Sequence, residues 1–371
     1  MISKRYLGAI GIAVVGVLGL TSCAAANEKP AAPAAGGSSA SAAPTSTLSG
    51  TLSGAGASTQ GSAQEAWIKG FQTANPNVTV NYDPTGSGAG KKTFIAGGSG
   101  WAGSDSYLTD AELGGTFAGC AAGSKAVDLP TYISPIAVIF KVDGVKELNL
   151  DAATLAGIFK GTITTWNDPA IVALNPNAKL PAANITAVHR SDDSGTTKNF
   201  ADYLNQVAPA VWDAKPADTF PFKAGEGAQG TAGVVSAVTN GSNTIGYADA
   251  SKAGSLTTAK IKVGDTFVGY TAEASAKVVA GSPLVAGRGA NDIAINLNRK
   301  TTDPTHYPLV LVSYSIVCEQ YADAKQGELV KAYISYITGT EGQAVAAKAA
   351  GSAPLSADLA GKVAKVLASV K

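Results

Sequence analysis

Three short turns rich in glycine and hydroxyl residues constrain the fold of this chain most. The turns at 54–59, 86–90 and 194–196 each follow an apolar or β-branched stretch and precede a stretch with helical spacing. Strand, glycine-rich turn and helix in this order are typical of α/β units built on a parallel sheet. About 320 residues lie beyond the N-terminal segments, more than one hydrophobic core usually supports. The sequence therefore predicts an α/β protein with two lobes.

The same turns favour an anionic ligand. The first N–H groups of a helix lack partners and carry the positive end of its dipole, and glycine lets a ligand approach the backbone closely. The turn at 194–196 comes shortly after Arg190, one of only four arginines in the chain. Its planar guanidinium suits tetrahedral oxyanions. Three such turns and this arginine indicate one shared oxyanion site.

Asp105 ends the segment Trp101–Asp105, and a carboxylate beside an anion site would be unusual because it normally repels the ligand. An ionised carboxylate only accepts hydrogen bonds, so it can pair only with a ligand oxygen that carries a proton. Phosphate keeps one or two protons at neutral pH, whereas sulfate keeps none. Asp105 would then select phosphate by rejecting fully ionised anions. The alternative is that Asp105 caps a helix or is a solvated turn residue.

The residues do not favour a nucleotide- or nucleic-acid-binding protein. The segment from Gly86 to Lys91 resembles a P-loop, but only three residues separate Gly86 from Gly90, and Lys92 stands where Ser or Thr is required. The formal net charge is +1, with no run of Lys or Arg. We therefore expect no nucleic-acid partner.

The residues do not favour a hydrolase either. Ser58, Ser87 and Ser194 are candidate nucleophiles, but each would need a base, usually His. The chain has two histidines. His189 should point to the opposite face of its strand from the neighbouring arginine, and His306 lies in a turn-like stretch. No Gly-x-Ser-x-Gly elbow occurs. We expect no enzymatic activity, catalytic metal or cofactor.

Residues 1–23 read as a lipoprotein signal peptide. Lys4 and Arg5 precede an apolar stretch that is short for a membrane span, and Leu20-Thr21-Ser22-Cys23 matches the bacterial lipobox. Lipidation of Cys23 would anchor the protein to the extracytoplasmic face of the cell membrane without spanning it. A chance cysteine after an export signal is the alternative. Residues 24–47 are rich in Ala, Pro, Gly, Ser and Thr and read as a flexible linker.

The turns, in this order, resemble the periplasmic phosphate-binding protein of the bacterial phosphate ABC transporter. The similar segments start near Leu48 and are Leu52–Ser58, Gly86-Ser87, Gly103–Asp105, residues 151–176 around Trp166, Arg190–Thr196 and Ile245–Tyr247. The resemblance implies a two-lobe periplasmic binding protein fold with a hinge and a ligand cleft between the lobes. Lobe I would combine 48–131 with 251–371, and lobe II would be 132–250.

The resemblance also implies which residues touch the ligand. By position, the phosphate contacts would come from Ser58, Thr59, Ser87, Asp105, Arg190, Ser194, Gly195 and Thr196. Asp192 would hold the guanidinium of Arg190. The family usually has an aromatic residue at Thr59 and a small residue at Asp193, so these positions depart from its pattern.

Two cysteines, Cys120 and Cys318, remain beyond the lipobox. In an exported protein a disulfide is their expected fate, and both fall in lobe I.

The expected function is binding of inorganic phosphate and its delivery, as a monomer, to the permease subunits of an ABC importer. The alternatives are a phosphate-ester hydrolase on a similar scaffold and a binder of another tetrahedral oxyanion such as sulfate or molybdate.

Overall fold

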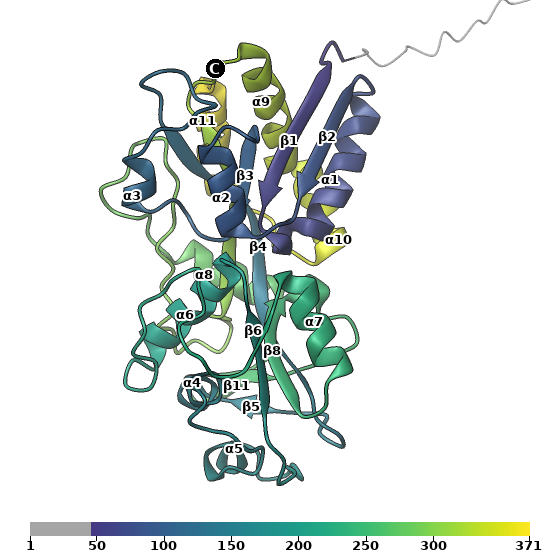
Figure 1. The fold of residues 1–371 in the computed structure, drawn as a ribbon, viewed down its shortest axis with the longest axis vertical. Helices are drawn as coiled ribbons and strands as arrows, with labels where there is room; N and C mark the ends of the chain where they lie inside the picture. The colour runs from purple at the N-terminus through teal and green to yellow at the C-terminus, as the bar shows by residue number, and fades with distance from the viewer. Residues whose placement is uncertain (1–45) are drawn as a thin grey trace, which may run out of the picture. The chain divides into compact units, whose positions relative to one another are not determined.

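The structure, a computed structural model, describes residues 46–371 (Figure 1). The expected signal peptide, most of the expected linker and Cys23 lie outside the described residues. Within 46–371, no helix combines the length and the apolar character that crossing a membrane requires.

A nine-stranded sheet forms the centre of the fold. Its strand order is β2-β1-β3-β12-β4-β8-β6-β7, and β9 pairs with β4 beside this path. The strands are β1 (Gly50–Gly56), β2 (Val78–Asp83), β3 (Trp101–Ser104), β4 (Ala126–Lys141), β6 (Thr186–Arg190), β7 (Glu226–Ala228), β8 (Thr244–Asp249), β9 (Thr257–Thr258) and β12 (Val310–Cys318). A second sheet, in the order β11-β10-β5, contains β5 (Asn149–Leu150), β10 (Lys260–Val263) and β11 (Thr266–Val268).

Helices pack against the sheet strands and against one another. They are α1 (Gly61–Ala74), α2 (Ser87–Ile95), α3 (Asp110–Leu113), α4 (Ala152–Lys160), α5 (Pro169–Leu174), α6 (Gly195–Val207), α7 (Gly230–Asn240), α8 (Ala272–Ala280), α9 (Ala324–Thr338), α10 (Thr340–Ala350) and α11 (Ala357–Ser369), with 3-10 turns η1 (Ser58–Gln60) and η2 (Ala250–Lys252). Helix α2 packs on β1 and β3, and α7 packs on β6 and β8.

The strand β4 belongs to both halves of the sheet. Its segment Ala126–Pro135 pairs antiparallel with β12, and its segment Ile136–Lys141 pairs antiparallel with β8. Every residue of β4 except Lys141 is buried. A buried strand has a near-continuous apolar sequence, and the apolar run from Ile136 to Phe140 therefore predicts such a strand. The structure places this run in the second part of the longer β4.

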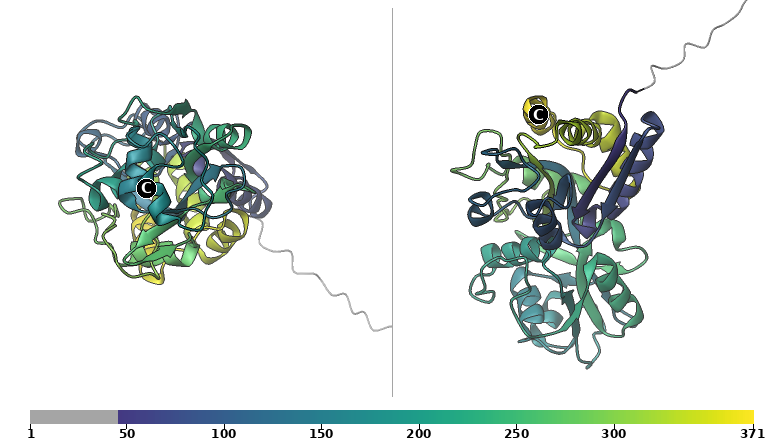
Figure 2. Two further views of the ribbon diagram at one scale, coloured as in Figure 1. Left: turned by 90° about the horizontal axis from the view of Figure 1, so that it is seen from below. Right: turned by 45° about the horizontal axis from the view of Figure 1, so that its top comes forward.

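The elements gather in two lobes on either side of the middle of β4. In Figure 1 and the right-hand view of Figure 2, most purple, blue and yellow elements lie in one half and most teal and green elements in the other. The expected α/β class is confirmed, with a sheet that is mixed rather than wholly parallel. Strands β1, β2 and β3 pair in parallel, as do β6, β7 and β8, whereas β12 and β4 run antiparallel to their neighbours.

The helical spacing in the sequence predicts a short helix from Lys91 and a helical stretch over 330–347. The first of these helices, α2, begins earlier, at Ser87. The second stretch is two helices, α9 and α10, that meet at Gly339. Residues 257–268 pair with strands that precede residue 151: β9 joins Ile139 and Phe140 of β4, and β10 joins β5.

Cys120 and Cys318 form a disulfide across 198 residues of sequence. Cys318 is fully buried at the end of β12, and Cys120 is 8% exposed. The bond therefore ties the segment after α3 to the central sheet.

Removing this disulfide should lower the stability of the protein. Closing so long a loop restricts the unfolded chain, and loss of such a bond typically costs about 2–5 kcal/mol. We expect the double substitution Cys120→Ala, Cys318→Ala to lower the melting temperature in a thermal unfolding experiment. A reductant should lower it for the parent and leave the double variant unchanged. Equal melting temperatures for parent and variant would show that the bond does not contribute to stability.

Candidate functional site

Arg190 ends strand β6 with its side chain buried. Its Nε donates to Asp192 Oδ1 at 2.7 Å, and its Nη2 donates to Asp192 Oδ2. Asp192 also accepts from the backbone N–H of Gly230 at 3.0 Å. Burial alone would raise the pKa of Asp192, but the hydrogen bonds and charge of Arg190 outweigh this effect and lower it. The pair fixes one edge of the guanidinium and leaves its remaining donors for another partner.

The N-terminus of helix α6 lies beside this arginine in sequence and beside Asp105 in space. Ser194 is the N-cap, and its Oγ accepts from the N–H of Thr197 at 3.3 Å. A Cβ on Gly195 would lie 2.7 Å from Cβ of Asp105, so only glycine allows this approach. The backbone N–H of Ser194 donates to the carbonyl of Asp218, so the hydroxyl is the remaining donor of this residue.

Asp105 follows strand β3 and is 3% exposed. Its Oδ1 accepts from Thr59 Oγ1 at 2.7 Å, and its Oδ2 accepts from Thr196 Oγ1 at 3.1 Å. Burial raises the pKa of this carboxyl, while hydrogen bonds from Ser313, Thr59 and Thr196 and the charge of Arg190 oppose the rise. A solvated turn residue would be exposed, and a helix cap would accept from N–H groups of the helix that follows it; the Asp105 carboxylate is buried and accepts from the hydroxyls of distant residues, so it has neither alternative role.

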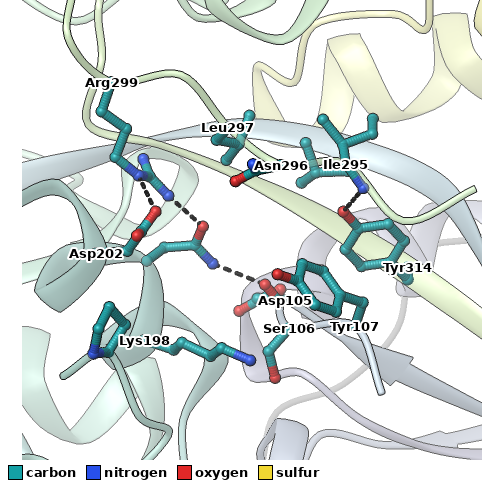
Figure 3. A pocket seen from close by; sticks show the side chains of 13 residues that line it. Asp105, Ser106, Tyr107, Lys198, Asp202, Ile295, Asn296, Leu297, Arg299 and Tyr314 are labelled. Carbon is teal, nitrogen blue, oxygen red and sulfur yellow. Dashed lines mark hydrogen bonds and ion pairs between the residues drawn. The ribbon is translucent and has the colours of Figure 1, made fainter. Parts of the chain in front are cut away.

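The backbone of Asp105 is held on both sides. Its N–H donates to Ser87 Oγ at 3.1 Å, and its carbonyl accepts from Asn199 Nδ2 at 2.7 Å. Asn199 Oδ1 in turn accepts from Arg299 Nη2 at 2.6 Å. Arg299 Nε donates to Asp202, as Figure 3 shows. These residues line a cavity of about 250 Å³ that has Asp105 at its edge. The sequence interpretation missed Asn199 and Arg299, because their partners lie far apart in the chain.

The glycine turn before α2 approaches Arg190 from the other lobe. Gly86 has a φ of 103°, and a Cβ there would lie 2.5 Å from Oδ2 of Asp192. The next residue, Ser87, is buried and bonded to Asp105. A larger residue at Gly86 would separate the turn from the arginine.

Ser58 contacts a residue that the sequence interpretation missed. Its Oγ lies 3.0 Å from Thr231 Oγ1 and accepts from the N–H of Thr231 at 3.2 Å. Thr231 lies in the first turn of α7, after the left-handed Gly230. Gly230-Thr231 has the same design as the three turns recognised in the sequence, a glycine and a hydroxyl residue at a helix start, so the signal was present.

The lysines of the segment that resembles a P-loop have carboxylate partners. Lys91 Nζ lies 3.0 Å from Asp218 and 3.2 Å from Glu112, with 4% of its side chain exposed. Lys92 Nζ lies 2.8 Å from Asp193. The hydrogen bond from Lys92 is the main reason that the pKa of Asp193 is lowered, and Thr219 contributes a second one. The carboxylate of Asp193 is therefore engaged by Lys92 and Thr219.

The expected site residues on the described chain thus gather from both lobes. Thr59, Ser87 and Thr196 meet at Asp105, and Gly86 links the second turn to Asp192 and Arg190.

The two histidines contact residues outside this group. His189 stacks on Phe220 with ring centroids 3.9 Å apart, and His306 Nδ1 contacts Thr301. Within residues 46–371 no cluster of His, Cys, Asp and Glu is suited to a metal ion.

Comparisons with known proteins agree with the fold. The PBP superfamily domain matches residues 41–341. Phosphate-binding protein PstS 3 of Mycobacterium leprae is 38% identical over 295 residues, which cover 78% of this chain and 79% of that protein. Phosphate-binding protein PstS 3 of Mycobacterium tuberculosis is 36% identical over 342 residues, 91% of each chain.

Solved structures share the fold at lower sequence identity. A high-affinity periplasmic phosphate-binding protein, PfluDING, solved with phosphate, has a TM-score of 0.68 at 21% identity and covers 85% of this chain and 93% of its own. The phosphate-binding protein of Stenotrophomonas maltophilia has a TM-score of 0.63 at 20% identity, over 85% of this chain and 94% of its own. The chain belongs to the PstS family of phosphate-binding proteins, within the PBP superfamily.

Proposed function

We propose that this protein binds inorganic phosphate between its lobes and delivers it to the permease of an ABC importer. One observation carries the proposal: a buried arginine and a buried carboxylate lie at the same group of hydroxyls and helix starts. The donors of Arg190 that Asp192 leaves free suit anionic oxygens, and an acceptor-only carboxylate requires a proton on that anion. Phosphate satisfies both requirements, whereas sulfate and molybdate satisfy only the first.

The proposed contacts divide by chemical role. Donors to the phosphate oxygens are the Ser58, Ser87 and Ser194 hydroxyls, the N–H groups of Thr59, Gly195 and Thr196, and the guanidinium of Arg190. Asp105 accepts the phosphate proton, and Asp192 orients Arg190. Dehydration of the anion is offset by these fixed donors, since charge-assisted hydrogen bonds are the strong ones in a buried site.

We propose that phosphate holds the lobes closed. Several contacts join elements of the two lobes around the site, among them Gly88 N–H to the carbonyl of Asp193 at 3.1 Å and the ion pair of Lys91 with Asp218. A ligand bound to both lobes favours the closed state, because its affinity for that state is higher.

The strands β9 and β10 pair with strands of the second lobe. We therefore propose that the chain returns to lobe I between α8 and β12, and not at residue 251 as the sequence suggests.

The alternative functions have weaker support. A phosphate-ester hydrolase needs a base or metal beside its nucleophile, and His189 instead stacks on Phe220 while its Nδ1 contacts the carbonyl of Arg190. A phosphate ester also replaces one phosphate oxygen by a substituted one, which is a poorer acceptor for the fixed donors of the site. We therefore favour a binding protein that releases its ligand unchanged.

We further propose that the mature protein is a monomer, anchored at the extracytoplasmic face of the membrane by lipid on Cys23. The sequence before residue 46, with its lipobox and its linker of small residues, supports this proposal. The anchor would keep the binding domain close to the membrane permease.

Replacing Arg190 by Ala should weaken phosphate binding at least about tenfold, because a charge-assisted pair in a buried site is worth about 2–5 kcal/mol. The measurement is isothermal titration of the domain with phosphate. Lys92→Ala is the matched control: it removes a cation near the site whose side chain is 75% exposed, and it should change affinity little. Arg190→Ala binding phosphate as well as the parent would show that Arg190 is not the anchor.

Replacing Asp105 by Asn should reduce discrimination against sulfate. Sulfate presents no proton to the carboxylate, and an unpaired buried charge should favour phosphate by about 10³-fold. An amide can donate as well as accept, so sulfate should compete better, while phosphate loses little affinity. The measurement is competition of sulfate against labelled phosphate for parent and variant. An unchanged ratio would place selectivity elsewhere.

Replacing Cys23 by Ala should release the protein from membranes of its host and leave phosphate binding intact, because the linker separates anchor and domain. Fractionation followed by phosphate titration of the released protein tests both parts. A variant that stays on the membrane after a high-salt wash would require another form of attachment.

A further inference from the structure

The hydroxyl of Thr59 is aimed at Asp105 from inside the protein. Thr59 lies in the 3-10 turn η1 and is fully buried. Its Oγ1 donates to Asp105 Oδ1 at 2.7 Å, the shorter of the two hydroxyl contacts measured to this carboxylate. The role expected for Thr59 was its backbone N–H, so this side-chain contact needs its own explanation.

Two hydroxyl hydrogen bonds occupy part of the acceptor capacity of Asp105. An ionised carboxylate offers about four lone-pair positions. Thr59 occupies one on Oδ1, and Thr196 occupies one on Oδ2. Each oxygen keeps a position that can accept a proton from the ligand.

We propose that the Thr59 hydroxyl is a positioning group that keeps Asp105 an oriented, acceptor-only carboxylate and so sets the selectivity for protonated over fully ionised oxyanions. This inference rests on the proposed phosphate function and adds a residue that acts through Asp105. The physical reason is that a hydrogen bond donated to a buried carboxylate stabilises its ionised form. A protonated Asp105 would be a donor, and sulfate could then accept from it.

The buried surroundings of Asp105 make the hydrogen bond from Thr59 important for the charge state of the carboxyl. Burial raises the pKa of the carboxyl, and few groups oppose the rise: three hydroxyls and the charge of Arg190 on β6. The other titratable groups that interact with it are Tyr82 on β2, Tyr132 on β4 and Asp249 at the end of β8. None of these supplies a positive charge. Loss of the Thr59 hydroxyl therefore raises the pKa of Asp105 further.

The test compares Thr59→Val with the parent. Valine keeps the shape and removes the hydroxyl. Phosphate and sulfate affinities are measured by isothermal titration at about pH 6 and about pH 8. We expect the phosphate-over-sulfate ratio to fall about tenfold in the variant, corresponding to a pKa change of about one unit, with the larger loss at the lower pH. Thr59→Ser should restore the parent ratio.

Control variants separate this effect from general damage. Thr338→Val removes another buried threonine hydroxyl, which donates to the carbonyl of Ile334 within α9, and should leave the ratio unchanged. Thr59→Ala provides the same loss of hydroxyl if valine unfolds the domain. A ratio equal to that of the parent, or an equal weakening for both anions, would overturn the inference while leaving phosphate binding standing. A parent that binds no phosphate would overturn both the proposed function and this inference.

Discussion

The shared strand β4 is the constraint on which the rest of the structure depends. Its backbone is committed to β12 along one part and to β8 along the other, so both lobes are built on one hydrogen-bonded strand. The carboxyl ends of parallel strands lie at the same edge of a sheet. The turns after β1 and β3 in one lobe and after β6 in the other therefore face the same region. The candidate site is the place where these ends meet.

Much of the candidate site could be predicted from the sequence because its signals are local. A glycine, a hydroxyl residue and a helix start lie within a few residues at Gly86-Ser87 and Ser194–Thr196, and the arginine precedes one of them. Such chemistry is carried by neighbouring residues and needs no tertiary information. The turn at Gly230-Thr231 has the same local form and was missed only because its strand, β7, is three residues long.

The parts that sequence reasoning missed depend on contacts between distant residues. The first half of β4 is interrupted by Pro130 and Pro135, which argue against a strand, yet both lie within its ladder with β12. The chain from Arg299 through Asn199 to Asp105 joins residues about 100 positions apart, with no pattern that links them. Asp193 pairs with Lys92, which comes from the other lobe, and no local pattern links the two residues.

The central claim is that one buried site selects a protonated tetrahedral anion, because the Arg190 guanidinium donates to the anion while Asp105 accepts its proton. The most direct measurement is isothermal titration of the unmodified domain with phosphate, with sulfate and with a phosphate monoester, each at neutral pH. The account predicts binding of phosphate at one site per chain, with sulfate weaker by about 10³-fold and the monoester also excluded. Sulfate or the monoester binding as tightly as phosphate would contradict it.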